Sequence, residues 1–179
     1  MRWRPDEGHV PRGFCGATGS LSDIRLVLVT AEPGDPLAGE MHDQSSPASV
    51  AEYSIGCLER RPTPFHQNIR IILDLCFPAL PLEKQLKFVW RTNAVLCSAR
   101  VESGPVPARI EKTCASEYLL KQIAIVPHAI VVALGGKAQK RLRMAGISAL
   151  PALHPSCRES AARKLASWQE IARRVQAAV

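Results

Sequence analysis

The sequence predicts a three-layer α/β/α domain built around a small, largely parallel sheet of four strands. Two observations predict this class. Short apolar runs rich in β-branched residues recur along the chain, as is typical of strands buried on both faces of a parallel sheet. Segments with the 3.6-residue apolar period of helices lie between and after these runs. Strands that alternate with helices indicate parallel pairing through crossover connections.

The expected strands come from continuous apolar runs that are too short for a buried helix. The run from Ile24 to Val29 is the clearest, because it holds only Arg25 as a charged residue. The expected strands are residues 24–29, 88–96, 129–134 and 147–153.

The expected helices come from apolar residues spaced three and four positions apart. Ile69, Ile72, Leu73 and Cys76 have this spacing after Phe65. A last helix, rich in alanine and arginine, places four apolar residues on one face: Leu165, Trp168, Ile171 and Val175. The expected helices are residues 65–76, 111–125, 137–144 and 160–175.

The remaining segments indicate the domain limits. Residues 1–23 are polar and rich in glycine and proline, so we expect an irregular N-terminal arm followed by a single domain over 24–179. Residues 31–64 hold recurring glycines, prolines and serines, and we expect a long loop there. A loop of that length is usually functional or disordered.

Composition favours a globular protein with a polyanionic partner. The chain has 179 residues, enough for one domain with a sizeable core, and a net charge of +7. No apolar run reaches the roughly 18 residues of a membrane helix, and the N-terminus lacks the apolar core of a secretory signal. We therefore expect a cytoplasmic protein whose six scattered cysteines are reduced thiols.

Three short motifs follow expected strands. They are residues 30–34 (TAEPG), 92–96 (TNAVL) and 154–156 (HPS). Ligands of open parallel sheets bind outside the carboxyl ends of the strands, so the motifs are expected to meet there. Together they bring a carboxylate, an amide and an imidazole, a set suited to cutting a base from a sugar.

Glu32, Asn93 and His154 each have a chemical interpretation, and Glu32 and Asn93 also have a structural one. Glu32 can orient or deprotonate a water, or it can be a solvated turn residue. The amide of Asn93 can match the donor and acceptor of the uracil edge, or bond to local backbone. The imidazole of His154 can hydrogen-bond a carbonyl oxygen as negative charge grows on a leaving base.

Other residues are candidates for contacts with a nucleic acid. Ser156 can cap the last helix, with Glu159 as its capping-box partner, and the N–H groups there suit a phosphate. Arg158 can contact phosphate or wedge into a duplex. Phe65 and Tyr53, in the expected loop before the first helix, are candidates to stack on a base or to pack in the core.

Lys137 belongs to a basic helix and is a further candidate DNA contact. It follows Gly135 and Gly136, but the frame of a nucleotide-binding phosphate loop is missing because Ala138 stands where the hydroxyl residue would be. This excludes a nucleoside triphosphatase of that type.

Taken together, the three motifs resemble those of the uracil-DNA glycosylase superfamily over about residues 24–175. The resemblance implies a base-flipping DNA glycosylase acting on uracil or a related deaminated base. Asn93 then reads the base edge, an aromatic such as Phe65 stacks on it, and His154 stabilises the departing anion. Arg158 lies where relatives insert a residue into the vacated duplex. The hydrolysis needs no metal or cofactor.

The sequence departs from the family pattern at two places. Members carry aspartate, alanine or asparagine where Glu32 stands. One branch holds an iron–sulfur cluster on four cysteines; Cys97 and Cys114 resemble its later pair, but Cys15 has no nearby companion. We therefore expect no cluster.

Two alternatives remain open. A catalytically silent nucleic-acid-binding protein of the same fold fits the unusual Glu32 and the missing cysteines. An unrelated α/β hydrolase or nucleotide-binding protein is the other, although the sequence has neither a G-x-S-x-G elbow nor a G-x-G-x-x-G fingerprint.

Overall fold

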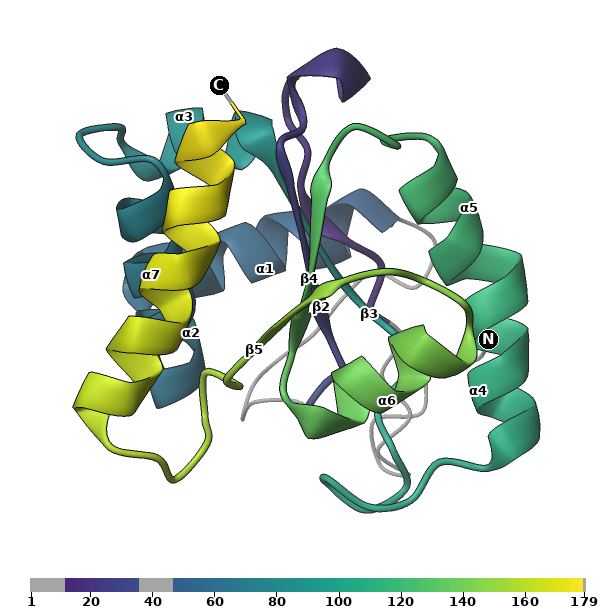
Figure 1. The fold of residues 1–179 in the computed structure, drawn as a ribbon. Helices are drawn as coiled ribbons and strands as arrows, with labels where there is room; N and C mark the ends of the chain where they lie inside the picture. The colour runs from purple at the N-terminus through teal and green to yellow at the C-terminus, as the bar shows by residue number, and fades with distance from the viewer. Residues whose placement is uncertain (1–11, 36–46, 179) are drawn as a thin grey trace.

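The computed structural model describes residues 12–35 and 47–178, which fold around one mixed sheet (Figure 1). The strand order is β1-β3-β2-β4-β5. Four strands run parallel, and the two-residue β1 pairs antiparallel with β3 at the edge. The strands are β1 (Cys15–Gly16), β2 (Leu26–Thr30), β3 (Val89–Asn93), β4 (Ile130–Leu134) and β5 (Leu150–Ala152). The predicted α/β class with a largely parallel sheet is confirmed, with one more strand than expected.

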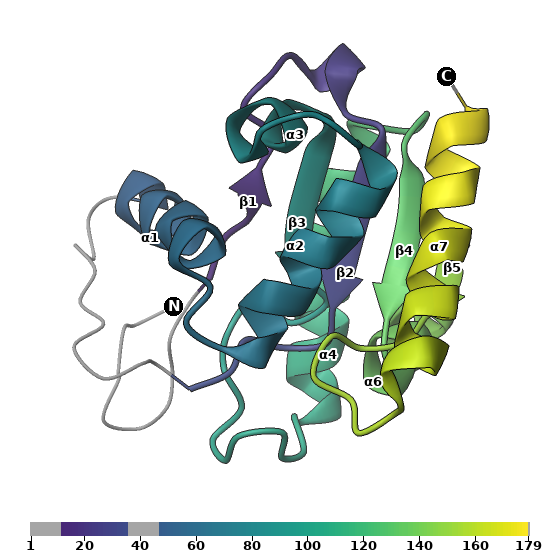
Figure 2. The ribbon, with the colours of Figure 1, turned by 90° about the vertical axis from the view of Figure 1, so that its left-hand side faces the viewer.

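Helices cover both faces of the sheet (Figures 1 and 2). One layer holds α1 (Pro47–Arg60), α2 (Pro64–Cys76), α3 (Leu82–Phe88) and α7 (Ala161–Ala177). The other holds α4 (Ala108–Cys114), α5 (Leu120–Ala124) and α6 (Gly136–Met144), with a π-helical turn at Ala115–Leu119 between α4 and α5. A single 3₁₀ turn spans Leu21–Asp23.

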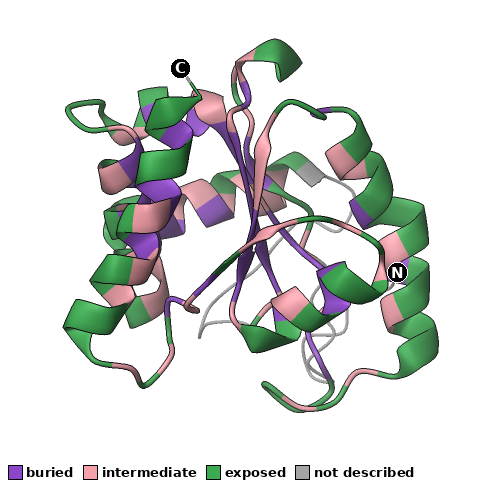
Figure 3. Cartoon of the chain, in the orientation of Figure 1, coloured by how far each residue is buried: buried purple, intermediate pink, exposed green. Residues whose placement is uncertain are grey.

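Alternating side chains of each strand enter two separate cores. On β2, Leu26 and Leu28 pack with the layer of α2 and α7, whereas Val27 and Val29 pack against α6 through Leu142. Every residue of β2 is buried, and Figure 3 shows the central strands as the most buried part of the chain. Burial on both faces explains why this strand reads as a continuous apolar run.

Two predicted segments are corrected. The arm over 1–23 was expected to be irregular, but β1 joins the sheet within it; residues 1–11 lie outside the described part. The segment 31–64, expected as a loop, contains the 14-residue helix α1, while its residues 36–46 are not described. Tyr53 therefore lies on a helix rather than in a loop, and Phe65 lies in the first turn of α2.

The register of the parallel strands brings their carboxyl ends to one edge. Thr30 pairs with Asn93 across β2 and β3, and Leu134 pairs with Ala152 across β4 and β5. The motifs that follow these strands consequently meet at the same edge, as the sequence predicts. Within the described ranges, no helix has the length and apolar character needed to cross a bilayer.

Candidate functional site

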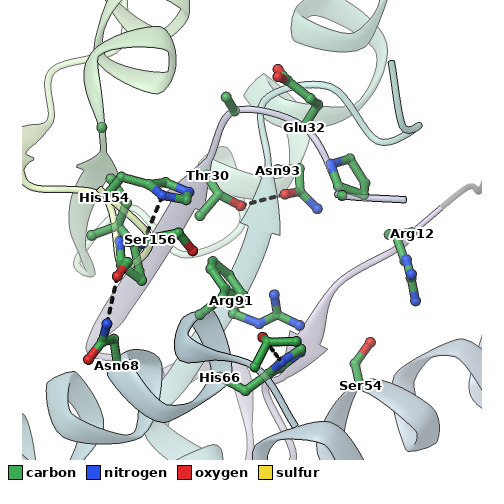
Figure 4. Close-up of a pocket in the computed structure, with 18 of the residues that line it drawn as sticks. Arg12, Thr30, Glu32, Ser54, His66, Asn68, Arg91, Asn93, His154 and Ser156 are labelled. Carbon is green, nitrogen blue, oxygen red and sulfur yellow. Dashed lines mark hydrogen bonds between the residues drawn. The ribbon is translucent and has the colours of Figure 1, made fainter. Parts of the chain in front are cut away.

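A cavity of about 660 Å³ lies at this edge, and residues of all three motifs line it. Its volume is within the range of about 300–1,000 Å³ found for small-molecule sites. Glu32, Asn93 and His154 are among the lining residues. Tyr53 on α1 and Phe65 on α2 line the cavity as well. Figure 4 shows that the imidazole of His154 and the amide of Asn93 lie on either side of Thr30.

Asn93 is held in one orientation by its neighbour on β2. The hydroxyl of Thr30 donates a hydrogen bond of 2.5 Å to Oδ1 of Asn93, whose residue is only 6% exposed. No residue in the described ranges accepts a hydrogen bond from Nδ2 of this amide. Because Oδ1 has a second lone pair, the fixed amide offers the cavity one acceptor site and the N–H donors of Nδ2.

His154 follows β5 and is held as a neutral imidazole. Burial lowers its pKa below the ordinary value, although the carboxylate of Glu32 acts in the opposite direction. The backbone N–H of Ser156 donates to Nδ1 of His154 at 3.1 Å, so this nitrogen carries no proton. The ring proton is therefore on Nε2, and the imidazole is a hydrogen-bond donor at that atom.

Two contacts position the segment around His154. Nδ2 of Asn68 on α2 donates to the carbonyl of Pro155 at 2.6 Å. Gly135, directly after β4, has φ of +90°, and a Cβ placed there would lie 2.8 Å from Cβ of His154. Glycine is required at this position both by the positive φ and by the close approach of the histidine.

Glu32 lines the cavity, but cations engage both oxygens of its carboxylate. Nζ of Lys137 lies 2.9 Å from Oε1, and Nη1 of Arg141 donates to Oε2. Arg141 also bonds Glu111 through Nε at 2.7 Å. The side chains of Glu32 and Arg141 are 6% and 8% exposed. Figure 4 shows the carboxylate pointing away from Asn93 and His154, so its assignment as a catalytic group stays a prediction.

The ammonium group of Lys137 is bonded to other groups of the protein. Besides Glu32, Nζ donates to the carbonyls of Ser103 at 2.6 Å and Gly104 at 3.0 Å. These three bonds account for the three donors of a lysine. Its predicted contact with DNA stays a prediction, and it would need one of these bonds to break.

The turn before α7 differs in detail from the prediction. The N-cap of α7 is Ser160, whose hydroxyl accepts a hydrogen bond from the backbone N–H of Arg163 at 3.3 Å. The expected capping box of Ser156 and Glu159 is therefore wrong, because the helix begins four residues later. Ser156 is exposed at the cavity, and Arg158 is exposed in the turn but does not line the cavity. Their contacts with DNA remain predictions.

The two aromatic candidates have different surroundings. The ring of Phe65 lies 5.8 Å from that of His154, between centroids, which places it beside the imidazole. The ring of Tyr53 has the guanidinium groups of Arg12 and Arg60 over it, at 5.8 and 5.9 Å from its centroid. Phe65 is therefore better placed than Tyr53 to stack on a base that contacts His154.

Comparison with known families agrees with this geometry. The model of the uracil DNA glycosylase superfamily matches residues 19–176. The chain belongs to this superfamily. Membership indicates a function of the uracil-DNA glycosylase type and makes DNA a plausible partner. A search of the curated proteins finds no match to the chain.

The cysteines do not form the four-thiolate set of the iron–sulfur branch of the superfamily. Cys15 is on β1, Cys97 follows β3 and Cys114 ends α4, and all of them are free thiols. In the part of the chain that the structure describes, no three His, Cys, Asp or Glu side chains are grouped so as to hold a metal ion. The expectation that the protein needs no cofactor, an iron–sulfur cluster included, remains a prediction.

Two residues that line the cavity, Thr30 and Arg91, were not predicted as site residues. Thr30 was part of a quoted motif, but its role depends on pairing with β3, which the motif does not show. Arg91 lines the cavity from β3. A signal was available for it, because residues two apart on a strand face the same side and Asn93 was already a candidate.

Proposed function

We propose that this protein is a DNA glycosylase that hydrolyses the N-glycosidic bond of uracil or a related deaminated base. The observation that carries the proposal is the meeting of Asn93, His154 and Phe65 at one cavity. An amide with a donor and an acceptor to offer, a neutral imidazole and an aromatic ring are the groups needed to read, polarise and stack a planar base. The net charge of +7 supports a DNA substrate.

In the proposed reaction, the target nucleotide leaves the helix and its base enters the cavity beside Phe65. Nδ2 of Asn93 donates to a ring carbonyl, and the second lone pair of Oδ1 accepts from the adjacent ring N–H. As the bond between the sugar C1′ and the base nitrogen breaks, its electron pair moves into the base. Nε2–H of His154 stabilises the resulting negative charge on the other carbonyl oxygen. Water then adds to C1′, and its proton is released to solvent or to the departed base.

In the proposed reaction, Glu32 contributes less to catalysis than His154 does. Its two ion pairs orient the carboxylate and offset its charge, which makes it a poor base for a water. Its remaining lone pairs can still accept a hydrogen bond, so an electrostatic contribution to the cationic sugar is retained in the proposal.

The competing function is nucleic-acid binding without catalysis. The paired state of Glu32 is the observation that favours it, because a superfamily enzyme that depended on this carboxylate would be inactive in this arrangement. The two functions differ in turnover, since only the enzyme leaves abasic sites that hot alkali cleaves.

The test uses the purified full chain with labelled oligonucleotides carrying one uracil or one hypoxanthine, in single and double strands, followed by hot alkali. We expect scission that is abolished by Asn93→Ala, while affinity for undamaged DNA is almost unchanged because phosphate contacts dominate such binding. The exposed Gln169 on α7 gives the matched amide control, Gln169→Ala. DNA binding without scission by the folded wild-type chain on every substrate would support the silent binding protein instead.

A further inference from the structure

Thr30 and Asn93 lie side by side at the carboxyl ends of β2 and β3, where they are partners in the register of the sheet. The backbone ladder continues past them. The N–H of Ala94 donates to the carbonyl of Thr30 at 2.8 Å, and the N–H of Val95 donates to the carbonyl of Ala31 at 2.9 Å. Thr30 and Asn93 are only 2% and 6% exposed. The hydroxyl and the amide are therefore held next to each other by fixed backbone on both strands.

The distance between the two side chains identifies which atom of the amide faces Thr30. An O–H donor lies about 2.5–3.0 Å from an oxygen acceptor, whereas an N–H donor lies about 2.7–3.2 Å from one. The contact between Oγ1 of Thr30 and the amide of Asn93 is 2.5 Å, which fits only the first case. Oδ1 therefore faces the hydroxyl, and Figure 4 shows Nδ2 on the far side of the amide from Thr30.

The hydroxyl of Thr30 stabilises this orientation of the amide against the reversed one. Its other acceptor, the carbonyl of Thr92, lies 3.4 Å from Oγ1, which is too long for a good O–H···O bond. In a reversed amide, Nδ2 of Asn93 would donate to Oγ1 and the hydroxyl hydrogen would have only that distant carbonyl. The bond that Oδ1 accepts also polarises the amide, so it strengthens Nδ2 as a donor.

The orientation of the amide decides which bases it matches. Uracil and hypoxanthine present a carbonyl oxygen beside a ring N–H, whereas cytosine and adenine present an amine beside an unprotonated ring nitrogen. With Nδ2 toward the cavity and one lone pair of Oδ1 left, Asn93 matches the carbonyl pattern. A reversed amide would match the amine pattern. An amine placed against Nδ2 would leave two donors facing each other without an acceptor, which is costly in a buried site.

We propose that Thr30 is a positioning residue that makes the cavity selective for bases with a carbonyl in place of an exocyclic amine. This inference rests on the proposed glycosylase function and assigns the selectivity of its site to one hydroxyl group. Thr30 acts through Asn93: it contacts neither the base nor the reacting bond, and the hydrolysis is unchanged. The hydroxyl sets the direction of the amide, and the amide distinguishes a deaminated base from its amino parent.

The experiment measures the affinity of the full chain for two matched pairs of single-stranded oligonucleotides. One pair carries uracil or cytosine and the other carries hypoxanthine or adenine, each on a 2′-fluoroarabino sugar that resists hydrolysis. Fluorescence anisotropy gives the ratio of affinities within each pair. We expect the wild type to bind the carbonyl base about tenfold tighter in at least one pair. Thr30→Val removes the hydroxyl at nearly constant volume and should lower that ratio about three- to tenfold, as the loss of one buried hydrogen bond implies.

Thr92→Val is the matched control. Thr92 is a buried threonine on the next strand, and its hydroxyl donates at 2.8 Å to Gln122 on α5 rather than to the amide of Asn93. The control removes the same chemical group but should leave the affinity ratio as in the wild type. Thr30→Ser keeps the hydroxyl and should retain the ratio, and Thr30→Ala replaces Thr30→Val if that variant does not fold. In an Asn93→Ala background, Thr30→Val should have no effect on the ratio.

The outcomes separate this inference from the proposed function. A preference for the carbonyl base that is reduced in Thr30→Val and kept in Thr30→Ser would sustain the role of Thr30, even if no oligonucleotide with an ordinary sugar were cleaved and the glycosylase proposal failed. Equal affinities within both pairs for the wild type would overturn the inference even if uracil were cleaved. A ratio that stays the same in Thr30→Val, or that falls equally in Thr92→Val, would overturn it as well.

Discussion

Two polar clusters lie at the same edge of the sheet and differ in how their hydrogen-bonding capacity is used. The recognition cluster, made of Thr30, Asn93 and His154, keeps a donor and an acceptor available to the cavity. The ion-pair cluster is made of Glu32, Glu111, Lys137 and Arg141, and its charges sum to zero. The contrast shows that a polar motif locates a site, whereas its contacts decide which groups remain free for a ligand.

The ion-pair cluster joins segments that are distant in the chain. Glu32 follows β2, Glu111 lies on α4, and Lys137 and Arg141 lie on α6. Lys137 also bonds the carbonyls of residues 103 and 104, so the loop before α4 is held as well. We therefore interpret this cluster as a structural element of the cavity wall and the recognition cluster as the chemical part of the site.

The largest effect on stability is expected from Arg141→Met. The substitution leaves the buried carboxylate of Glu32 with Lys137 alone and removes the partner of Glu111. Breaking a buried pair costs about 3–5 kcal/mol, and the partial exposure of Glu111 places this case near the lower end. Chemical denaturation measures the loss. Arg143→Met on the same helix is the exposed control, and equal midpoints for the two variants would show that the cluster contributes nothing.

The largest effect on chemistry is expected from His154→Ala. Removing one preorganised donor from a developing anion lowers kcat by about 10²–10³-fold. Single-turnover cleavage of a uracil oligonucleotide measures it, with His128→Ala as the control because His128 is exposed in the turn before β4. If His154→Ala retained most of the activity, His154 would not be the main catalytic group. A loss in Glu32→Gln that exceeded the loss in His154→Ala would show that catalysis depends on the ion-pair cluster instead.

A smaller effect is expected from Gly135→Ala, which acts on His154 indirectly. The new Cβ meets Cβ of His154 at 2.8 Å on a backbone with φ of +90°. Strained backbone of this kind costs roughly 1–3 kcal/mol, and the histidine must shift. Both unfolding and cleavage should respond. Gly136→Ala is the neighbouring control, because a Cβ there meets nothing within 4 Å. Equal behaviour of the two variants would contradict a positioning role for Gly135.

The buried strands and the three motifs were predictable because their signals are local. Residues 24–29 were predicted as a strand because their apolar run is continuous, and the strand observed at Leu26–Thr30 is buried on both faces. The rule that ligands bind at the carboxyl ends of parallel strands then placed Glu32, Asn93 and His154 together. Helix α1 was not predictable in the same way, since its sequence includes Ser49, Ser54 and Gly56 and has a weak apolar face.

The pairing of Glu32 could not be predicted from sequence. Its partner Arg141 is 109 residues away, and α6 reads only as a basic helix until it is packed on the sheet. The same holds for Arg91, which is one arginine within an apolar strand. The lack of an acceptor for its buried Nε among the described residues is a property of the packing rather than of the motif.

The smallest expected effect concerns pH and connects the two clusters. Because burial holds the pKa of His154 below its ordinary value of 6.5, the neutral imidazole persists to a lower pH than in an unfolded chain. The unfolded state then binds more protons below that value, so the stability from this residue is present above pH 6.5 and is lost as the pH falls through the folded-state pKa. Cleavage should lose activity over the same acidic range, as His154 becomes protonated.

Glu32 raises the pKa of His154, in opposition to burial, so Glu32→Gln should lower this pKa further and move the acid limb of cleavage to lower pH. A pH–rate profile from about pH 5 to about pH 8 measures the shift, with His128→Ala expected to leave the limb in place. A limb that moved to higher pH would contradict this coupling. If Glu32→Gln abolished cleavage at every pH in a folded protein, Glu32 would be the catalytic carboxylate that the sequence predicts, and the ion pairs seen here would have to open during the reaction.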